Sequence, residues 1–220
     1  KDGQAQLLEG IDKNKDQSYC LAQISKEQLN YALFPLGEMH KEDVRILAEK
    51  IRLPVAKKKD SQGICFLGKV KVPQFLSNFI DDQPGEIVTT QGKVVGRHQG
   101  LHRYTLGQRK GIGVPSNTDF ENFVVTGKNQ EMNQLVVAFE DPKEPTLWGY
   151  NYRIESVFFF NDKFPTEKIQ LLGKARYRDP SIPIIFQPLE DPKADILFKS
   201  PQRALTPGQI LAIYEGERLI

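Results

Sequence analysis

From Trp148 onward, the chain consists almost entirely of short β-type runs separated by Pro, Asp and Gly. These runs cover residues 153–160, 168–177, 182–187, 196–199 and 210–214. Strands of this length at regular spacing are typical of a small barrel or sandwich. The pattern therefore predicts a separate all-β domain over residues 146–220.

The preceding segment, residues 70–145, follows a different pattern. Apolar residues spaced along 72–79 predict one short helix. Two β-type runs flank Gln91-Gly92, which is a hairpin signature. The apolar runs at 123–125 and 135–138 predict two more strands. This segment is predicted to be a small central α+β domain.

Residues 1–69 are predicted to be helical with short connections. Asp16 can cap a first helix, and Ser25 with Gln28 forms a capping box for a second. A third helix has one apolar face and is stopped by Pro54. The three predicted helices span residues 19–24, 26–33 and 44–51. Helices without a sheet of their own are expected to be the back end of a larger α/β nucleotide-binding domain whose front end is missing.

Cysteine usage and hydropathy exclude several classes of protein. Two cysteines in 220 residues do not make a disulfide framework, which favours a reducing compartment, the cytoplasm or an organellar matrix. No apolar run approaches the roughly 20 residues of a membrane span. Neither the cysteines nor the carboxylates show metal-ligand spacing, so no structural metal is predicted.

The distribution of charge is more informative than the net charge of +2. Between Lys93 and Asn117 there is no Asp or Glu. The cations and histidines of this stretch are Lys93, Arg97, His98, His102, Arg103, Arg109 and Lys110. A single-sign, glycine-rich segment favours a surface that follows a phosphate backbone, and the alternative is a solvated face of a small domain.

A cationic loop that contains glycine leads directly into Cys65. Its sequence is Ala56-Lys57-Lys58-Lys59-Asp60-Ser61-Gln62-Gly63-Ile64-Cys65-Phe66. Nearby lysine charges favour the nucleophilic thiolate by lowering the thiol pKa, and Gly63 lets the backbone turn. Because Ile64 and Phe66 are apolar, the alternative is a buried and inert cysteine. The residues alone leave both readings open.

Several motifs, in one order along nearly the whole chain, resemble those of the tRNA-specific 2-thiouridylases, which place sulfur on the wobble uridine of certain tRNAs. They are residues 57–68 around Cys65, Asn14-Lys15-Asp16-Gln17-Ser18-Tyr19, Leu33-Phe34-Pro35-Leu36-Gly37-Glu38, Gly96-Arg97-His98-Gln99-Gly100-Leu101, Tyr104-Thr105-Leu106-Gly107-Gln108-Arg109-Lys110-Gly111, Ala175-Arg176-Tyr177-Arg178 and Leu205-Thr206-Pro207-Gly208-Gln209.

The resemblance implies ATP-dependent transfer of persulfide sulfur to C2 of the wobble uridine. Cys65 matches the family's persulfide carrier, whereas the family's second cysteine precedes the region present here and Cys20 does not match it. The family's pyrophosphate-binding loop has no counterpart in this sequence. ATP, with Mg²⁺, is therefore expected to bind outside this chain. The implied partners are tRNA and a sulfur-donor protein, either a cysteine desulfurase or a relay protein, with no membrane.

The fold implied is mixed α/β and β, in three parts. Residues 1–69 would be the C-terminal part of an adenine nucleotide alpha hydrolase-like catalytic domain. Residues 70–145 would be the small central domain, and residues 146–220 a C-terminal β-barrel.

Three groups match positions that the family uses for tRNA. Lys15-Asp16-Gln17 could meet phosphate and base or ribose edges, although Asp16 could equally cap a helix. Arg176-Tyr177 could hold an unstacked base, or Tyr177 could point into the core of an alternating strand. Gln209 follows a Pro-Gly turn that could simply precede a strand. Because Asp179-Pro180 should end the strand, we expect Arg176 to be exposed near a barrel rim.

Two other functions are compatible with the sequence. A binding module that contacts RNA without chemistry would tolerate replacement of Cys65. A thiol-based sulfur carrier that does not act on nucleic acid would not need the basic stretch or Arg176-Tyr177.

Overall fold

The computed structural model describes residues 5–59, 75–115, 122–141, 146–160, 164–190 and 192–220. The chain divides into two compact units. The first consists of Lys1–Lys59, Tyr150–Pro201 and Pro207–Ile220, and the second of Asp60–Gly149 and Gln202–Thr206. None of the helices in the described ranges is long and apolar enough to cross a membrane.

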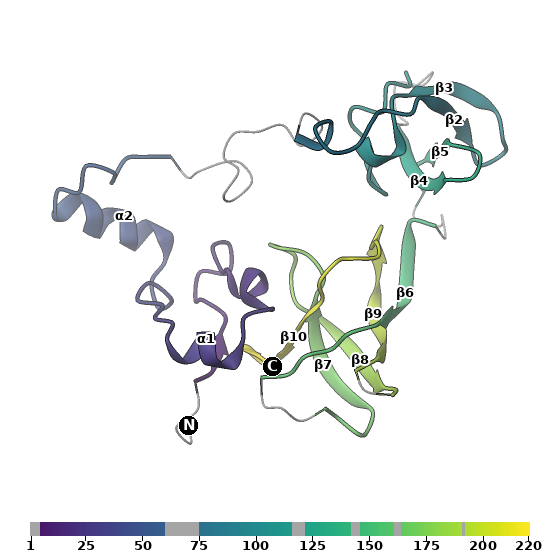
Figure 1. The fold of residues 1–220 in the computed structure, drawn as a ribbon. Helices are drawn as coiled ribbons and strands as arrows, with labels where there is room; N and C mark the ends of the chain where they lie inside the picture. Colours follow the sequence, from purple (N-terminus) through teal and green to yellow (C-terminus); the bar gives the residue numbers. More distant parts are fainter. Residues whose placement is uncertain (1–4, 60–74, 116–121, 142–145, 161–163, 191) are drawn as a thin grey trace. The chain divides into compact units, whose positions relative to one another are not determined.

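A seven-stranded sheet dominates the first unit, in the order β1-β11-β10-β7-β8-β9-β6 (Figure 1). Its strands are β1 (Leu7–Leu8), β6 (Trp148–Ile154), β7 (Ile169–Lys174), β8 (Ile182–Pro188), β9 (Ala194–Arg203), β10 (Ala212–Glu215) and β11 (Arg218–Leu219). Alternate side chains are buried in the middle of β8, at Ile184 and Phe186, and in the first half of β9, at Ala194, Ile196 and Phe198, as the period of a strand requires. The expectation of a mixed α/β and β fold is confirmed.

The strand expected over residues 153–160 lies earlier, as β6. In the rest of the expected run, Phe159 is buried by packing instead of by strand pairing, whereas Phe158 is exposed. Phe159 is 6% exposed, and its ring meets Phe164 and Phe186 edge-on, at centroid distances of 6.2 and 5.7 Å. The apolar run therefore predicted the burial of Phe159 but not the secondary structure around it.

The N-terminal segment joins the sheet of the first unit. Strand β1 pairs antiparallel with β11, so that Leu7 lies opposite Leu219. Both residues belong to a buried cluster with Leu29, Ala212 and Tyr214. Residues near the two ends of the printed sequence thus share one hydrophobic core.

The helices of this segment agree only partly with expectation. Helix α1 (Lys26–Asn30) begins with the predicted capping box of Ser25 and Gln28 but ends earlier than predicted. The first expected helix is a short 3-10 turn, η1 (Ser18–Leu21). Its N-cap is Gln17, without a side-chain cap, so the prediction that Asp16 caps it is wrong. Asp16 is instead occupied by the contacts described below.

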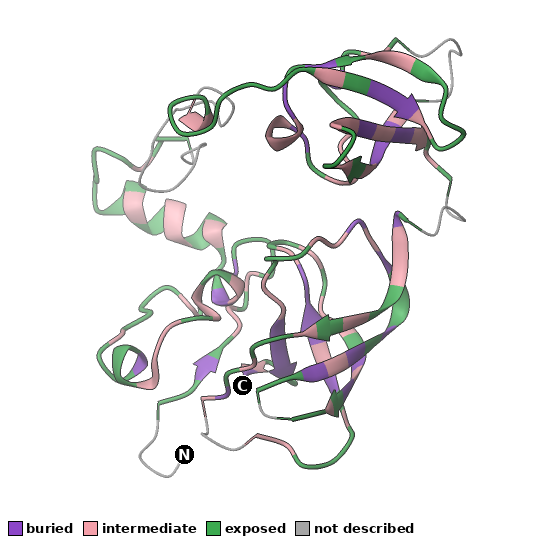
Figure 2. Cartoon of the chain, turned by 45° about the vertical axis from the view of Figure 1, so that its right-hand side comes forward, coloured by how far each residue is buried: buried purple, intermediate pink, exposed green. Residues whose placement is uncertain are grey.

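Helix α2 (Lys41–Lys50) was expected from its apolar face, and it forms. None of its residues is buried, as Figure 2 shows. Ile46 is 65% exposed and Leu47 is 44% exposed. Ile51, just beyond the helix, is 57% exposed. The described part of the chain therefore does not cover the apolar residues of α2.

The second unit contains a four-stranded sheet in the order β3-β2-β5-β4. Its strands are β2 (Gly85–Thr89), β3 (Val94–His98), β4 (Phe123–Asn129) and β5 (Gln134–Phe139). The predicted hairpin is confirmed by the antiparallel pairing of β2 with β3 and by a φ of +81° at Gly92. Ile87, Val125, Leu135 and Val137 form its fully buried core. The helix expected over residues 72–79 lies partly outside the described residues.

The contacts group residues 1–59 with the C-terminal sheet, whereas the sequence predicts a boundary at residue 69 and another at 145. A compact unit built from separate stretches of chain can still contain more than one evolutionary domain. The three-part division stays a prediction.

Candidate nucleic-acid interface

Three segments that are far apart in the sequence meet at the hydroxyl of Tyr19, within the first unit. The Oη atom lies 3.1 Å from the carbonyl oxygen of Ala175 and 3.1 Å from that of Ile210. Ala175 directly precedes Arg176, and Ile210 directly follows Gln209. Tyr19 itself lies two residues after Gln17. The fold thus brings together the three groups that the sequence predicts for tRNA contact.

A buried ion cluster fixes the N-terminal segment to β7. The Nζ atom of Lys174 lies 2.7 Å from Glu9 and 3.3 Å from Asp16, and all three side chains are less than 10% exposed. Asp16 also accepts hydrogen bonds from the backbone N–H groups of Gly10 and Ser18 and from the Ser18 hydroxyl. A buried cation requires such partners, because desolvation without them would be costly.

The contacts of the cluster shift the pKa values of Asp16 and Lys174. Burial alone would raise the pKa of Asp16, but hydrogen bonds from Gly10 and Ser18 and the charge of Lys174 hold it below its ordinary value. Burial alone would lower the pKa of Lys174, but Glu9 and then Asp16 raise it. Asp16 and Lys174 are therefore both charged at neutral pH.

Strand β7 ends at Lys174, so Arg176 and Tyr177 lie in the turn that follows. The N–H of Asp179 donates to the carbonyl of Arg176, which closes this turn. The strand therefore ends earlier than the expected run over residues 168–177, which Asp179-Pro180 was expected to end. The alternative of an inward-pointing Tyr177 is wrong, since that residue is 36% exposed and Arg178 lies over its ring at 5.4 Å.

The predicted RNA contacts differ in their exposure. Lys15, Gln17 and Gln209 are exposed, and Arg176 is half-buried instead of fully exposed. Asp16 is 7% exposed, and both carboxylate oxygens have protein partners. These assignments to RNA stay predictions, and the geometry gives Asp16 a structural contact in any case.

The basic stretch lies in the second unit, and part of its charge is already used. Arg103 makes two 2.6 Å hydrogen bonds to Asp82, and Arg109 lies 2.9 Å from Glu140. Lys93, Arg97 and Lys110 are exposed. The stretch therefore offers fewer available cations than its sequence indicates.

Sequence models of known families match the chain in three consecutive parts. They are described as the tRNA methyl transferase HUP domain (residues 1–69), the tRNA methyl transferase PRC-barrel domain (residues 73–139) and the aminomethyltransferase beta-barrel domain (residues 151–220). Curated relatives called tRNA-specific 2-thiouridylase MnmA match over the whole chain. The chain belongs to the tRNA-specific 2-thiouridylase family.

The relatives include proteins from distant bacteria. That of Pasteurella multocida (strain Pm70) is 46% identical over 220 residues, which cover 99% of this chain and 57% of that protein. That of Halalkalibacterium halodurans is 43% identical over 216 residues, covering 98% of this chain and 57% of that protein. That of Shewanella sp. (strain MR-4) is 42% identical over 218 residues, covering 98% and 58%. The chain thus spans somewhat more than half the length of these relatives.

Cys65, the predicted persulfide carrier, lies outside the described residues, so its surroundings stay a prediction. Cys20 is described and exposed, at the start of the first unit. Cys20 lies in η1 and is the other of the two cysteines in the sequence. Its replacement by Ser therefore serves as a control for the loss of a thiol at Cys65.

The described residues do not build a phosphate loop for ATP. The nearest glycine cluster contains Gly111 and Gly113, with φ of +74° and +82°, around the buried Ile112. This loop does not lie between a strand and a helix, which is the arrangement that aims backbone N–H groups at a phosphate. These described residues therefore do not fit the phosphates of ATP.

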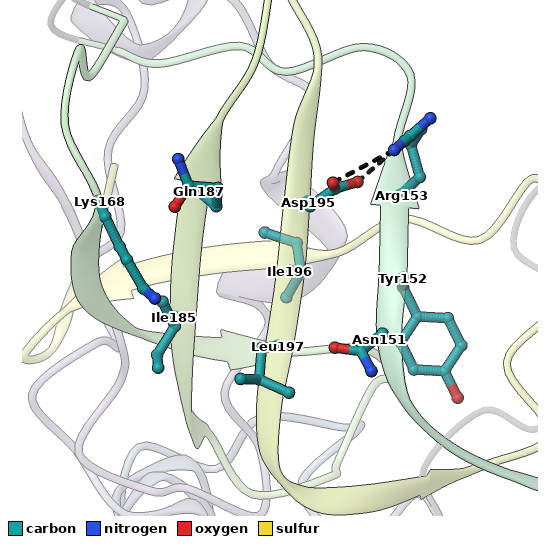
Figure 3. Close-up of a pocket in the computed structure, with 9 residues that line it drawn as sticks. All are labelled: Asn151, Tyr152, Arg153, Lys168, Ile185, Gln187, Asp195, Ile196 and Leu197. Carbon is teal, nitrogen blue, oxygen red and sulfur yellow. Dashed lines mark hydrogen bonds and ion pairs between the residues drawn. The ribbon is translucent and has the colours of Figure 1, made fainter.

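A pocket of about 540 Å³ lies on β6, β8 and β9, as Figure 3 shows. Arg153 on β6 pairs with Asp195 on β9 at 2.9 Å. Ile185 and Leu197 supply apolar surface, and Lys168 adds one further cation. Because Arg153 and Asp195 neutralise each other, the pocket lacks the concentrated positive charge that favours a phosphate.

Sequence reasoning missed Tyr19, Glu9 and Lys174 as parts of this interface. For Lys174 a signal was present, because a lysine within an apolar strand is almost never buried unless it is paired. Tyr19 lies inside a family motif, but its two backbone partners are more than 150 residues away. Only the tertiary structure could identify them.

Proposed function

We propose that this chain is the tRNA-holding and sulfur-carrying part of an ATP-dependent tRNA 2-thiouridylase. The observation that supports this most directly is the meeting of the three predicted tRNA segments around the Tyr19 hydroxyl. These three segments are far apart in the sequence but lie together in the fold, as contact with one RNA requires. The activity is a proposal for the whole protein, since the chain spans 57–59% of its relatives.

Recognition of RNA at this edge would combine charge with stacking. The exposed Tyr177 offers a ring face to an unstacked base, and Arg176 a planar cation beside it. Lys15 would meet a phosphate, and the amides of Gln17 and Gln209 would bond base or ribose edges. Asp16 would hold its segment in place from within.

The chemistry proposed for the chain is carried by Cys65. When bound, ATP supplies activation of the C2 oxygen of uridine, which is otherwise a poor leaving group. Cys65 would present a persulfide whose outer sulfur attacks C2 while the activated oxygen leaves with AMP, and the flanking lysines would favour the anionic form of the persulfide. The family's second cysteine, outside this chain, would then attack the sulfur of Cys65, which forms a disulfide between the two cysteines and leaves the outer sulfur on C2. A sulfur-donor protein, a cysteine desulfurase or a relay protein, would recharge the cysteine. Such a reaction is expected in the cytoplasm or an organellar matrix, where thiols stay reduced.

The test is replacement of Cys65 by Ser in a protein of the full length of the relatives, with Cys20→Ser as the matched control. We expect Cys65→Ser to abolish 2-thiouridine formation, measured by mass spectrometry of digested tRNA. The affinity for tRNA should stay nearly unchanged. Cys20→Ser should retain both properties.

Two results would point to the other functions. Thiolation retained in Cys65→Ser would reject the cysteine as carrier and favour a binding module. Persulfide loading of Cys65 without any binding of tRNA would favour a sulfur carrier that acts on other thiols.

A further inference from the structure

The Tyr19 hydroxyl lies where the ladder between β7 and β10 ends. The last pair of that ladder is Lys174 with Ala212. Ala175 lies just after β7 and Ile210 just before β10. The carbonyl oxygens of both residues lie 3.1 Å from Tyr19 Oη. A hydroxyl has one proton, so it donates to one carbonyl at a time or is shared between the two. The Tyr19 hydroxyl thus bridges the two segments at the point where the pairing of β7 with β10 ends.

The position of Tyr19 is itself fixed by the contacts of the preceding residue and of its own ring. The hydroxyl of the preceding residue, Ser18, donates to Asp16 and lies 2.9 Å from the hydroxyl of Tyr214 on β10. Lys174 ties Asp16 to the last residue of β7. The Tyr19 ring packs against the buried cluster around Leu7 and Leu29. The hydroxyl therefore projects from a rigid support.

Arg176 directly follows Ala175, whose carbonyl oxygen lies 3.1 Å from the Tyr19 hydroxyl. Burial raises the pKa of Tyr19, and the positive charge of Arg176 opposes that rise. A shift of the backbone at Ala175 would therefore move both Arg176 and the neighbouring Tyr177.

We propose that Tyr19 is a positioning residue for tRNA binding. Its hydroxyl holds the turn that carries Arg176 at a fixed distance from the loop that carries Gln209, so that the two contact one tRNA together. Tyr19 need not touch the RNA. The proposal rests on the proposed function of this edge, but it concerns a residue beneath the edge.

The test uses a double-mutant cycle in the 220-residue chain. The affinity for a labelled tRNA transcript with uridine at the wobble position is measured by fluorescence anisotropy for Tyr19→Phe, Arg176→Ala and the double variant. The Phe variant keeps the ring in the core and removes only the hydroxyl. Tyr150→Phe, at a 48% exposed tyrosine of the same unit, is the matched control. Affinities are compared at a temperature where circular dichroism shows each variant folded.

We expect Arg176→Ala to weaken binding roughly tenfold, as loss of a charge-assisted contact would. Tyr19→Phe should weaken it about three- to tenfold, and the double variant by much less than the product of the two. Tyr150→Phe should bind as the unaltered chain does. Coupling of this kind distinguishes positioning of Arg176 from a general loss of stability, which would make the two effects multiply.

The outcomes separate the two proposals. If Arg176→Ala weakens binding and Tyr19→Phe does not, Tyr19 has no positioning role and the RNA-binding edge stands. If the two effects multiply, Tyr19 acts independently of Arg176 and the inference is wrong. If Arg176→Ala and Gln209→Ala both leave the affinity unchanged, the edge itself is not the tRNA site.

Discussion

In the first unit the side chain of Lys174 is 7% exposed and lies between two carboxylates, whereas in the second unit Arg109 is 59% exposed and pairs with Glu140 at the surface. An exposed ion pair contributes little, because water and salt screen it. A buried cation that loses its partners, or carboxylates that lose their cation, cost several kcal/mol. Ion pairs thus have an architectural role in the first unit, whereas the exposed pair of the second unit adds little to stability.

The single tryptophan makes this comparison measurable. Trp148 is the first residue of β6, but by its contacts it belongs to the second unit, where it packs against the cluster of Val124, Leu147 and Ala204. Its fluorescence therefore follows unfolding of the second unit, and far-ultraviolet circular dichroism follows both. A variant that affects one unit can be recognised by which signal moves.

The largest effect is expected for Lys174→Met. It leaves the buried carboxylate of Asp16 without its cation and Glu9 with only the half-exposed Lys13, so the first unit should lose about 3–5 kcal/mol of unfolding free energy. Urea unfolding followed by circular dichroism should shift to lower denaturant, while the Trp148 transition moves little. The matched control is Arg153→Met, which breaks the exposed pair with Asp195 and should change the midpoint far less. Equal shifts in the two variants would contradict the contrast between buried and exposed pairs.

A somewhat smaller effect is expected for Gly107→Ala in the second unit. Gly107 has a φ of +76°, and an added Cβ would lie 2.7 Å from both Ala204 Cβ and Arg203 Nη1. The positive φ costs about 1–2 kcal/mol and the crowding adds to it, so we expect a loss of about 2–4 kcal/mol in the Trp148 transition. Gly113→Ala is the control, since its φ is +82° but nothing lies within 4 Å of the added carbon. The two variants should differ by the cost of crowding, and equal losses would show that the segment at Arg203 yields.

The smallest effect is expected for Asp16→Asn. The amide keeps an acceptor for Gly10 and Ser18 but loses its charge toward Lys174, which retains Glu9. We expect a loss of about 1–2 kcal/mol at neutral pH. Because the folded-state pKa of Asp16 is below its ordinary value of 3.8, the stabilisation is present above that value and is lost as the pH falls through the folded-state pKa.

The pH series gives this prediction its control. The difference between Asp16→Asn and the unaltered chain should shrink as the pH falls below 3.8, measured by urea unfolding at each pH. A difference that stays constant down to low pH would mean that the charge of Asp16 does not stabilise the first unit.

Much of the secondary structure could be predicted from local pattern. The hairpin at Gly92, the capping box at Ser25 and the strand expected over residues 182–187 formed, and the run over 196–199 lies within the longer β9, because neighbouring residues decide turns, caps and strand runs. The predicted contacts Lys15, Gln17 and Gln209 are exposed, as an RNA-facing role requires. Asp16 was placed in the right segment, but neither its burial nor its partner Lys174 could be read from the residues around it.

By itself, the sequence determined the family and the order of strands and turns, because motifs and periodicity are local properties of the chain. The tertiary structure alone decided that β1 pairs with β11 and that the Tyr19 hydroxyl meets the carbonyls of Ala175 and Ile210. Such contacts depend on how separate segments pack. The sequence around a polar side chain does not show whether its partner is water, RNA or a residue 150 positions away. The partner depends on whether the side chain is buried, and burial is a property of the assembled fold.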